Sequence, residues 1–206
     1  MKFINLGGLG GCRITDVLNS CGYRTEAYPF DWNNTNQDFP INTIMSNGEM
    51  FFSFDDKYVV NSNNLISPCN NAFTAHDFNG DWSYKKHYTK EKYYRRLSRL
   101  LSIIKSDERI IFCREMLEEV GYRDHSDILD YAPTFRVVAD SILKWEIFID
   151  HLKSIRTAET KLMLFTVNSN INSEYNDIEI IHWNRDIEEM KNAFNFAYNK
   201  YKDDLV

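Results

Sequence analysis

A chain of 206 residues, 43% hydrophobic and 15% aromatic, is long and apolar enough to fold as a single domain over residues 1–206. Its net charge of −6 gives no electrostatic basis for binding nucleic acid, and no apolar run reaches the roughly 18 to 20 residues of a membrane span. The four cysteines form no CxxC pair, so we expect free thiols in the cytoplasm, with neither a metal nor an organic cofactor.

The amino-terminal elements predicted in chain order are a strand, a glycine-rich turn and a helix. Residues 2–6 (KFINL) suit a short strand, and residues 12–23 carry apolar side chains at helical spacing, ending near Gly22. The turn between them holds half of the eight glycines of the chain: Gly7, Gly8, Gly10 and Gly11.

The middle of the chain is less regular. Residues 33–40 are polar and typical of a loop, and residues 41–47 (INTIMSN) suit a short helix. The β-rich stretches in residues 50–60 suit a hairpin around an acidic turn, whereas residues 61–83 are rich in Asn and Ser and show no clear period.

The second half alternates between helices and strands. We predict helices over 89–106, 134–155 and 186–203, and strands over 109–115, 161–167 and 178–183. This order predicts an α/β fold, a Rossmann-like, mostly parallel sheet layered with helices. Binding sites in such sheets form outside the carboxyl ends of the strands, where the glycine turn would lie.

The glycine turn does not match a nucleotide-binding loop. The dinucleotide fingerprint G-x-G-x-x-G, counted from Gly8, needs a glycine at the position of Arg13. A P-loop needs a Gly-Lys-Ser/Thr sequence, and no lysine follows this turn.

Cys12 is the reactive residue beside the turn. At the start of a helix, free N–H groups and the helix dipole favour the thiolate, and the same N–H groups can hold an oxyanion. Gly10 and Gly11 would let a substrate approach the backbone closely. Cys12 therefore suits a nucleophile; the alternative is a small apolar side chain packed beneath the turn.

A thiol nucleophile needs a base, normally a histidine oriented by an acid. Two of the five histidines suit this role. His76 stands beside Asp77 in an irregular segment of the kind that carries function. His182 follows a predicted strand and could face the same sheet edge as Cys12.

Polar residues at two further places suit a binding site. Asp31 lies between Phe30 and Trp32 in AYPFDW, so its carboxylate should be a turn cap or be paired with Arg13, an arginine of YYRRLSR or a catalytic histidine. The arginines of YYRRLSR recur on one helical face and can clamp a carboxylate or phosphate; the alternative is a solvated basic face. They are Arg95, Arg96 and Arg99.

Several of these segments, in this order, resemble the family of putative papain-like cysteine peptidases: LGGLGGCR, AYPFDW, AHDF and YYRRLSRLLSIIKSDERIIFCR. The resemblance covers residues 3–114, and Pro-Phe-Asp-Trp is its most specific part. It implies that Cys12 is the nucleophile, that His76 is the base and that Asp31 or Asp77 is the orienting acid. It also implies that the YYRRLSR arginines support the site or bind substrate, and it offers an α+β papain-like fold as the alternative.

Two functions of different classes fit the sequence. A cysteine hydrolase or acyltransferase would act on a small-molecule, peptide or glycan substrate bound by Gly10, Gly11, Arg13, Trp32 and the three arginines. A non-catalytic ligand- or partner-binding domain, saccharide-associated and with a decayed site, would instead use a pocket lined by Trp32, Trp82 and the arginines. Members of the family commonly have a polar residue where this chain has Gly11. Since glycine has no side chain to donate a hydrogen bond, only the backbone here could stabilise an oxyanion.

Overall fold

The computed structural model describes residues 1–8, 11–51, 60–61, 64–66, 72–74, 82–117 and 138–202. Gly10, His76 and Asp77 lie outside these ranges, as does most of the hairpin predicted over 50–60. The described elements, in chain order, are β1 (Lys2–Asn5), α1 (Gly11–Ser20), β2 (Asn33–Thr35), α2 (Asp38–Met45), β3 (Val60–Asn61), β4 (Asn64–Ile66), β5 (Ala72–Thr74), α3 (Trp82–Ile104), β6 (Ile110–Glu115), α5 (Ile142–Ile155), β7 (Thr160–Thr166), β8 (Ile178–His182) and α6 (Ile187–Lys202).

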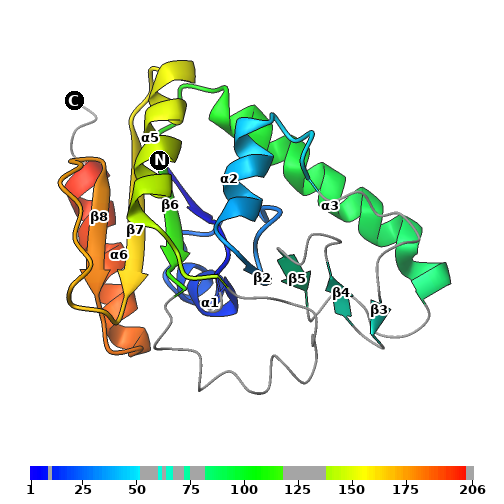
Figure 1. Ribbon diagram of the computed structural model, residues 1–206, viewed down its shortest axis with the longest axis horizontal. Coiled ribbons are helices and arrows are strands. Elements are labelled where there is room, and N and C mark those ends of the chain that lie inside the picture. The colour runs from blue at the N-terminus through cyan, green and yellow to red at the C-terminus, as the bar shows by residue number, and fades with distance from the viewer. Residues whose placement is uncertain are drawn as a thin grey trace.

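A parallel sheet of four strands, in the order β1-β6-β7-β8, lies on the left in Figure 1, and the small second sheet and α3 extend to its right. Within the parallel sheet, Phe112 of β6 pairs with Ile4 of β1 on one side and with Leu162 of β7 on the other. Every residue of β6 is buried, which requires the nearly continuous apolar run of this strand. The predicted α/β fold with a mostly parallel sheet is therefore confirmed.

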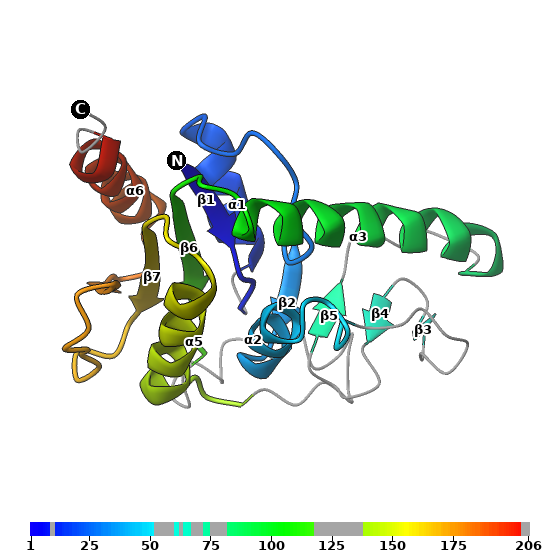
Figure 2. The same cartoon turned by 90° about the horizontal axis from the view of Figure 1, so that it is seen from above.

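Helices cover both faces of this sheet. Phe3, Ile111 and Met163 share one hydrophobic core with α1 and α6, whereas Ile4 and Phe112 share the other with α2, α3 and α5. Figure 2 shows α1 and α6 on one side of the sheet and α2 and α5 on the other. Successive strand residues point to opposite faces, so each strand contributes to both cores.

The helices lie where they were predicted, although their ends differ. Helix α3 begins seven residues before the predicted 89–106, and α5 begins eight residues after the start of the predicted 134–155. The buried Arg156 follows α5 and donates to the carbonyls of Ile104 and Ser106 at the end of α3, at 3.2 and 3.3 Å. In the parts of the chain that the structure describes, no helix is long and apolar enough to cross a membrane.

The predicted loop at residues 33–40 is instead largely buried and forms β2 and the start of α2. Strand β2 belongs to a small antiparallel sheet in the order β2-β5-β4-β3. The next two residues, Asn36 and Gln37, are polar and also buried. Hydrogen bonds to other parts of the protein replace those that they would make with water. Asn36 Oδ1 accepts the Val138 N–H at 3.0 Å, and the Gln37 amide exchanges two hydrogen bonds with the Ser141 backbone, at 2.7 and 2.8 Å. Unpaired, each such group would cost about 1–3 kcal/mol.

Two glycines of the turn after β1 are required by geometry. Gly7 and Gly8 have φ angles of +79° and +114°, which side chains rarely allow. A Cβ on Gly8 would lie 2.3 Å from the carbonyl oxygen of Glu115 in β6, and one on Gly7 would lie 2.4 Å from Thr35 Oγ1. These glycines therefore let the chain pass closely between β2 and the end of β6.

Replacing Gly8 should destabilise the fold far more than replacing another glycine with positive φ. Gly8→Ala combines backbone strain with a clash against a backbone oxygen, so we expect a loss of about 3 kcal/mol in the free energy of unfolding. Gly22→Ala is the matched control, because Gly22 has a φ of +73° but nothing within 4 Å of its added Cβ. The free energy of unfolding of Gly22→Ala should fall by only about 1 kcal/mol. Urea denaturation of both variants measures the difference, and equal losses would contradict the close approach.

Candidate functional site

Cys12 lies at the carboxyl edge of the parallel sheet, as the sequence predicts. It is the second residue of α1, which follows β1 across the glycine turn. Its side chain is half-buried, and its Sγ donates towards the carbonyl oxygen of Trp32 at 3.9 Å. The thiol therefore faces the turn formed by Pro-Phe-Asp-Trp, the most specific motif of the sequence.

Asp31 holds that turn together through a buried ion pair. Both Nε and Nη2 of Arg24 donate to Asp31 Oδ2 at 3.0 Å, and the Tyr28 N–H donates to the same oxygen at 2.9 Å. Burial raises the pKa of Asp31, while the Tyr28 N–H and the Arg24 guanidinium oppose the shift. The sequence suggested Arg13 or an arginine of α3 as the ion-pair partner of Asp31, and this is wrong. The ion pair is formed with Arg24, which the sequence did not single out.

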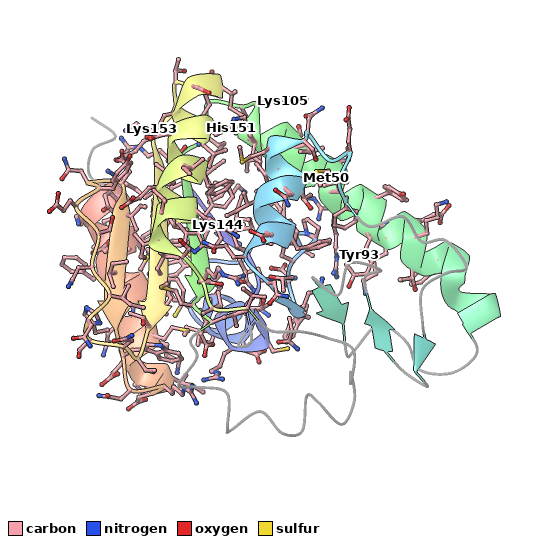
Figure 3. The ribbon with its side chains drawn as sticks, in the orientation of Figure 1. Met50, Tyr93, Lys105, Lys144, His151 and Lys153 are labelled. Carbon is pink, nitrogen blue, oxygen red and sulfur yellow. The ribbon has the colours of Figure 1, made fainter. Side chains whose placement is uncertain are left out.

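The residues on either side of Asp31 fix the position of the Trp32 carbonyl. Trp32 has a φ of +66°, an arrangement that costs about 1–3 kcal/mol for a residue with a side chain. Asn33 compensates by donating from Nδ2 to the Pro29 carbonyl at 2.7 Å and by accepting the Tyr93 hydroxyl on Oδ1 at 3.0 Å. Tyr93 reaches this bond from the side of α3 that faces β2 (Figure 3).

Burial and a neighbouring charge raise the pKa of the Cys12 thiol in this setting. Burial raises its pKa most, and the carboxylate of Asp16 adds to the increase. The Cys12 N–H and the Arg13 guanidinium lower the pKa but do not outweigh these effects. The pKa of the thiol is therefore raised even though Cys12 stands at the start of a helix.

Arg13, the residue after Cys12, reaches from α1 to the ends of β6 and β8. Its Nη1 lies 3.5 Å from Oε1 of Glu115, the buried last residue of β6, and its guanidinium carbon lies 5.6 Å from the ring centre of Trp183. The side chain keeps an exposed fraction of 28%. Arg13 therefore spans the sheet edge next to Cys12 with part of its side chain exposed.

The three α3 arginines do not gather in one place. Arg96 lies over the ring of Tyr93, at 5.6 Å from its centre, and its charge acts on Asp31. Arg99 donates to the Ala27 carbonyl at 2.5 Å and lies 3.4 Å from Glu26 Oε1. Arg95 and Arg99 both line a cavity that includes Lys2, at the amino end of β1. Of the three arginines, Arg96 alone acts on Asp31, in the turn that Cys12 faces.

His182 lies at the end of β8 and is exposed. Strand β8 is three positions from β1 in the sheet, and neighbouring strands are about 4.8 Å apart. Its neighbour Trp183 contacts Arg13 rather than Cys12. In the described ranges, no three His, Cys, Asp or Glu side chains come together as a metal site.

Arg114 is a structural residue of the site that sequence reasoning missed. Its side chain is fully buried and pairs with Asp140, donating from Nη2 at 2.9 Å as well as from Nε. It also donates to the carbonyls of Leu6 and Thr35, at 3.2 and 2.9 Å, and to Thr35 Oγ1 at 3.0 Å. A charged residue inside the buried strand 109–115 was the signal that could have indicated this role.

The geometry describes an α/β protein with a cysteine at a helix N-terminus, facing a braced turn at the carboxyl edge of a parallel sheet. The chain belongs to the family described as putative papain-like cysteine peptidase, which matches residues 1–149. The match extends past residue 114, where the resemblance seen in the sequence ends. No curated protein and no solved structure matches the chain.

Removing the charge of Asp16 should make Cys12 more reactive. Asp16 is exposed and lies one helical turn after Cys12, so Asp16→Asn should lower the thiol pKa and increase the thiolate fraction at neutral pH. We expect iodoacetamide to alkylate Cys12 about two- to fivefold faster at pH 7. Glu49→Gln, an exposed charge removed after α2, is the control and should leave the rate unchanged. Equal rates in Asp16→Asn and wild type would show that Asp16 does not act on the thiol.

Proposed function

We propose that this protein is a cysteine-dependent hydrolase or acyltransferase, with Cys12 as the nucleophile and His76 as the general base. Membership of the family supports cysteine chemistry, and the position of Cys12 at the sheet edge supports its role. The observation that carries the proposal is the pairing of β5 with β2 beside Cys12.

This pairing brings the end of β5 beside the turn that Cys12 faces. Thr74, the last residue of β5, pairs with Asn33, which directly follows Trp32, and the Trp32 carbonyl accepts from Cys12 Sγ at 3.9 Å. His76 follows Thr74 by two residues in the sequence, which supports His76 over His182 as the base. His182 ends β8, three strands from β1 in the sheet.

The reaction uses groups that the first turn of α1 already provides. His76 takes the proton of Cys12, and the thiolate attacks an acyl carbon, whose carbonyl electrons move onto oxygen. The N–H groups at the start of α1 have no partners within the helix and would hold this oxyanion, with Gly10 and Gly11 leaving room for the substrate. Collapse of the intermediate expels the leaving group with the proton from His76 and forms a thioester. Water, deprotonated by His76, then releases the acid; another acceptor would give acyl transfer.

The carboxylates have different roles in this proposal. Asp31 already accepts three hydrogen bonds from Arg24 and Tyr28, so we assign it to positioning the turn that Cys12 faces. Asp77, the neighbour of His76, is then the candidate acid that orients the base. Arg13 and Trp32 flank the thiol and are the candidates for substrate contact.

A burst assay with p-nitrophenyl acetate tests the proposal without knowledge of the natural substrate. Wild-type protein should release p-nitrophenolate in a stoichiometric burst, and mass spectrometry should find the acetyl group on the Cys12 peptide. Cys12→Ala should abolish the burst, and His76→Ala should slow it by about 100-fold or more, as expected for loss of a general base.

Cys21→Ala is the matched control, because Cys21 is also half-buried and lies just after the same helix. Its burst should equal that of wild type. A burst that survives in Cys12→Ala would refute Cys12 as the nucleophile, and the raised thiol pKa would then fit the non-catalytic binding domain instead.

A further inference from the structure

A cavity of about 510 Å³ opens at the amino end of the parallel sheet, away from Cys12. One stripe of α3 forms a wall of it, with Arg95 and Arg99 one turn apart and Ser98 and Ser102 one turn apart. Lys2, the first residue of β1, forms another part of the lining. Two guanidinium groups, an ammonium group and hydroxyl groups therefore line the same open space, together with Glu26 and Glu108.

The charges in this cavity do not cancel. Arg99 lies 3.4 Å from Glu26, and Glu108 accepts from the amino terminus at 3.1 Å, so both acids of the lining have cationic partners. Among the described residues, Lys2 has only a hydroxyl partner, Thr25 Oγ1 at 3.0 Å. The exposed Arg95 has no hydrogen bond or ion pair with another described residue. Lys2 and Arg95 therefore have no carboxylate partner in the part of the chain that the structure describes.

We propose that this cavity binds a small organic phosphate monoester, with Arg95 and Lys2 holding the phosphate. A monoester carries close to two negative charges at pH 7, which matches these two cations. Guanidinium forks bind phosphate oxygens in pairs, and the serine hydroxyls can donate to the remaining oxygen. The volume lies within the range of small-molecule sites and exceeds the needs of phosphate alone, so it leaves room for the organic part.

This site is separate from the proposed catalytic centre. It opens at the amino end of β1, whereas Cys12 follows the carboxyl end of the same strand. Arg95 and Arg99, considered from the sequence as substrate residues for Cys12, belong to it instead. Binding here can therefore be measured in a Cys12→Ala protein, so its failure and that of the thiol chemistry are distinguishable.

Calorimetric titration of the Cys12→Ala protein with phenyl phosphate tests the proposal. We expect saturable binding, with benzoate, a monoanion on the same ring, binding about tenfold more weakly or less. Arg95→Ala should weaken phenyl phosphate binding about tenfold, because it removes a charge-assisted contact. Lys90→Ala removes one positive charge from an exposed α3 position outside the cavity lining and should leave the dissociation constant unchanged.

Glu26→Gln provides a change in the opposite direction. It removes a negative charge from the cavity and frees Arg99 from its ion pair, so phenyl phosphate should bind severalfold more tightly. An Arg95→Ala dissociation constant equal to that of Lys90→Ala would overturn the site. Benzoate binding as tight as that of phenyl phosphate would overturn the assignment to a phosphate monoester.

Discussion

The buried ion pair between Arg114 and Asp140 is the interaction on which the architecture of the site depends. Arg114 is fully buried, and such a charge is tolerated only when its partner and its hydrogen bonds replace water. The guanidinium joins the end of β6 to the Leu6 carbonyl after β1, to Thr35 of β2 and to Asp140 before α5. Its carbon also lies 5.4 Å from the ring centre of Trp145 in α5. One guanidinium group therefore links four segments of the chain: the end of β6, the turn after β1, β2 and the residues before α5.

This constraint explains why the sheet edge can carry a site. Thr35 Oγ1, which Arg114 contacts, also donates to the Leu6 carbonyl at 3.0 Å and accepts the Gly8 N–H at 3.2 Å. The turn that leads to α1 is thus tied to β2, and β2 begins directly after Trp32. The pair formed by Asp31 and Arg24 fixes the other side of that turn. Cys12 and the Trp32 carbonyl therefore meet on a rigid frame built from polar groups.

Much of this arrangement could be predicted from periodicity, and the rest depends on contacts that periodicity does not contain. The apolar pattern of strands and helices was sufficient to predict the parallel sheet and to place Cys12 at its carboxyl edge. Residues 33–37 looked like a loop because their hydrogen-bond partners lie far away in sequence, as with Ser141 for Gln37. Sequence alone could not show which arginine pairs with Asp31, because several arginines are candidates and only interatomic distances distinguish them. Nor does the helical spacing of Arg95 and Arg99 indicate which end of the sheet these side chains face.

The pH dependence of Cys12 alkylation, in wild type and in His76→Ala, tests the central claim most directly. If His76 is the base, its imidazolium should stabilise the thiolate and outweigh burial and Asp16, so the wild-type rate should rise with a midpoint below the ordinary cysteine pKa of about 8.5. In His76→Ala the midpoint should move above that value, since burial and Asp16 both raise the pKa of this thiol. Alkylation of Cys21 in the same digests provides the internal reference. Identical profiles for the two proteins, both with the high midpoint, would contradict the assignment of His76 as the base that activates Cys12.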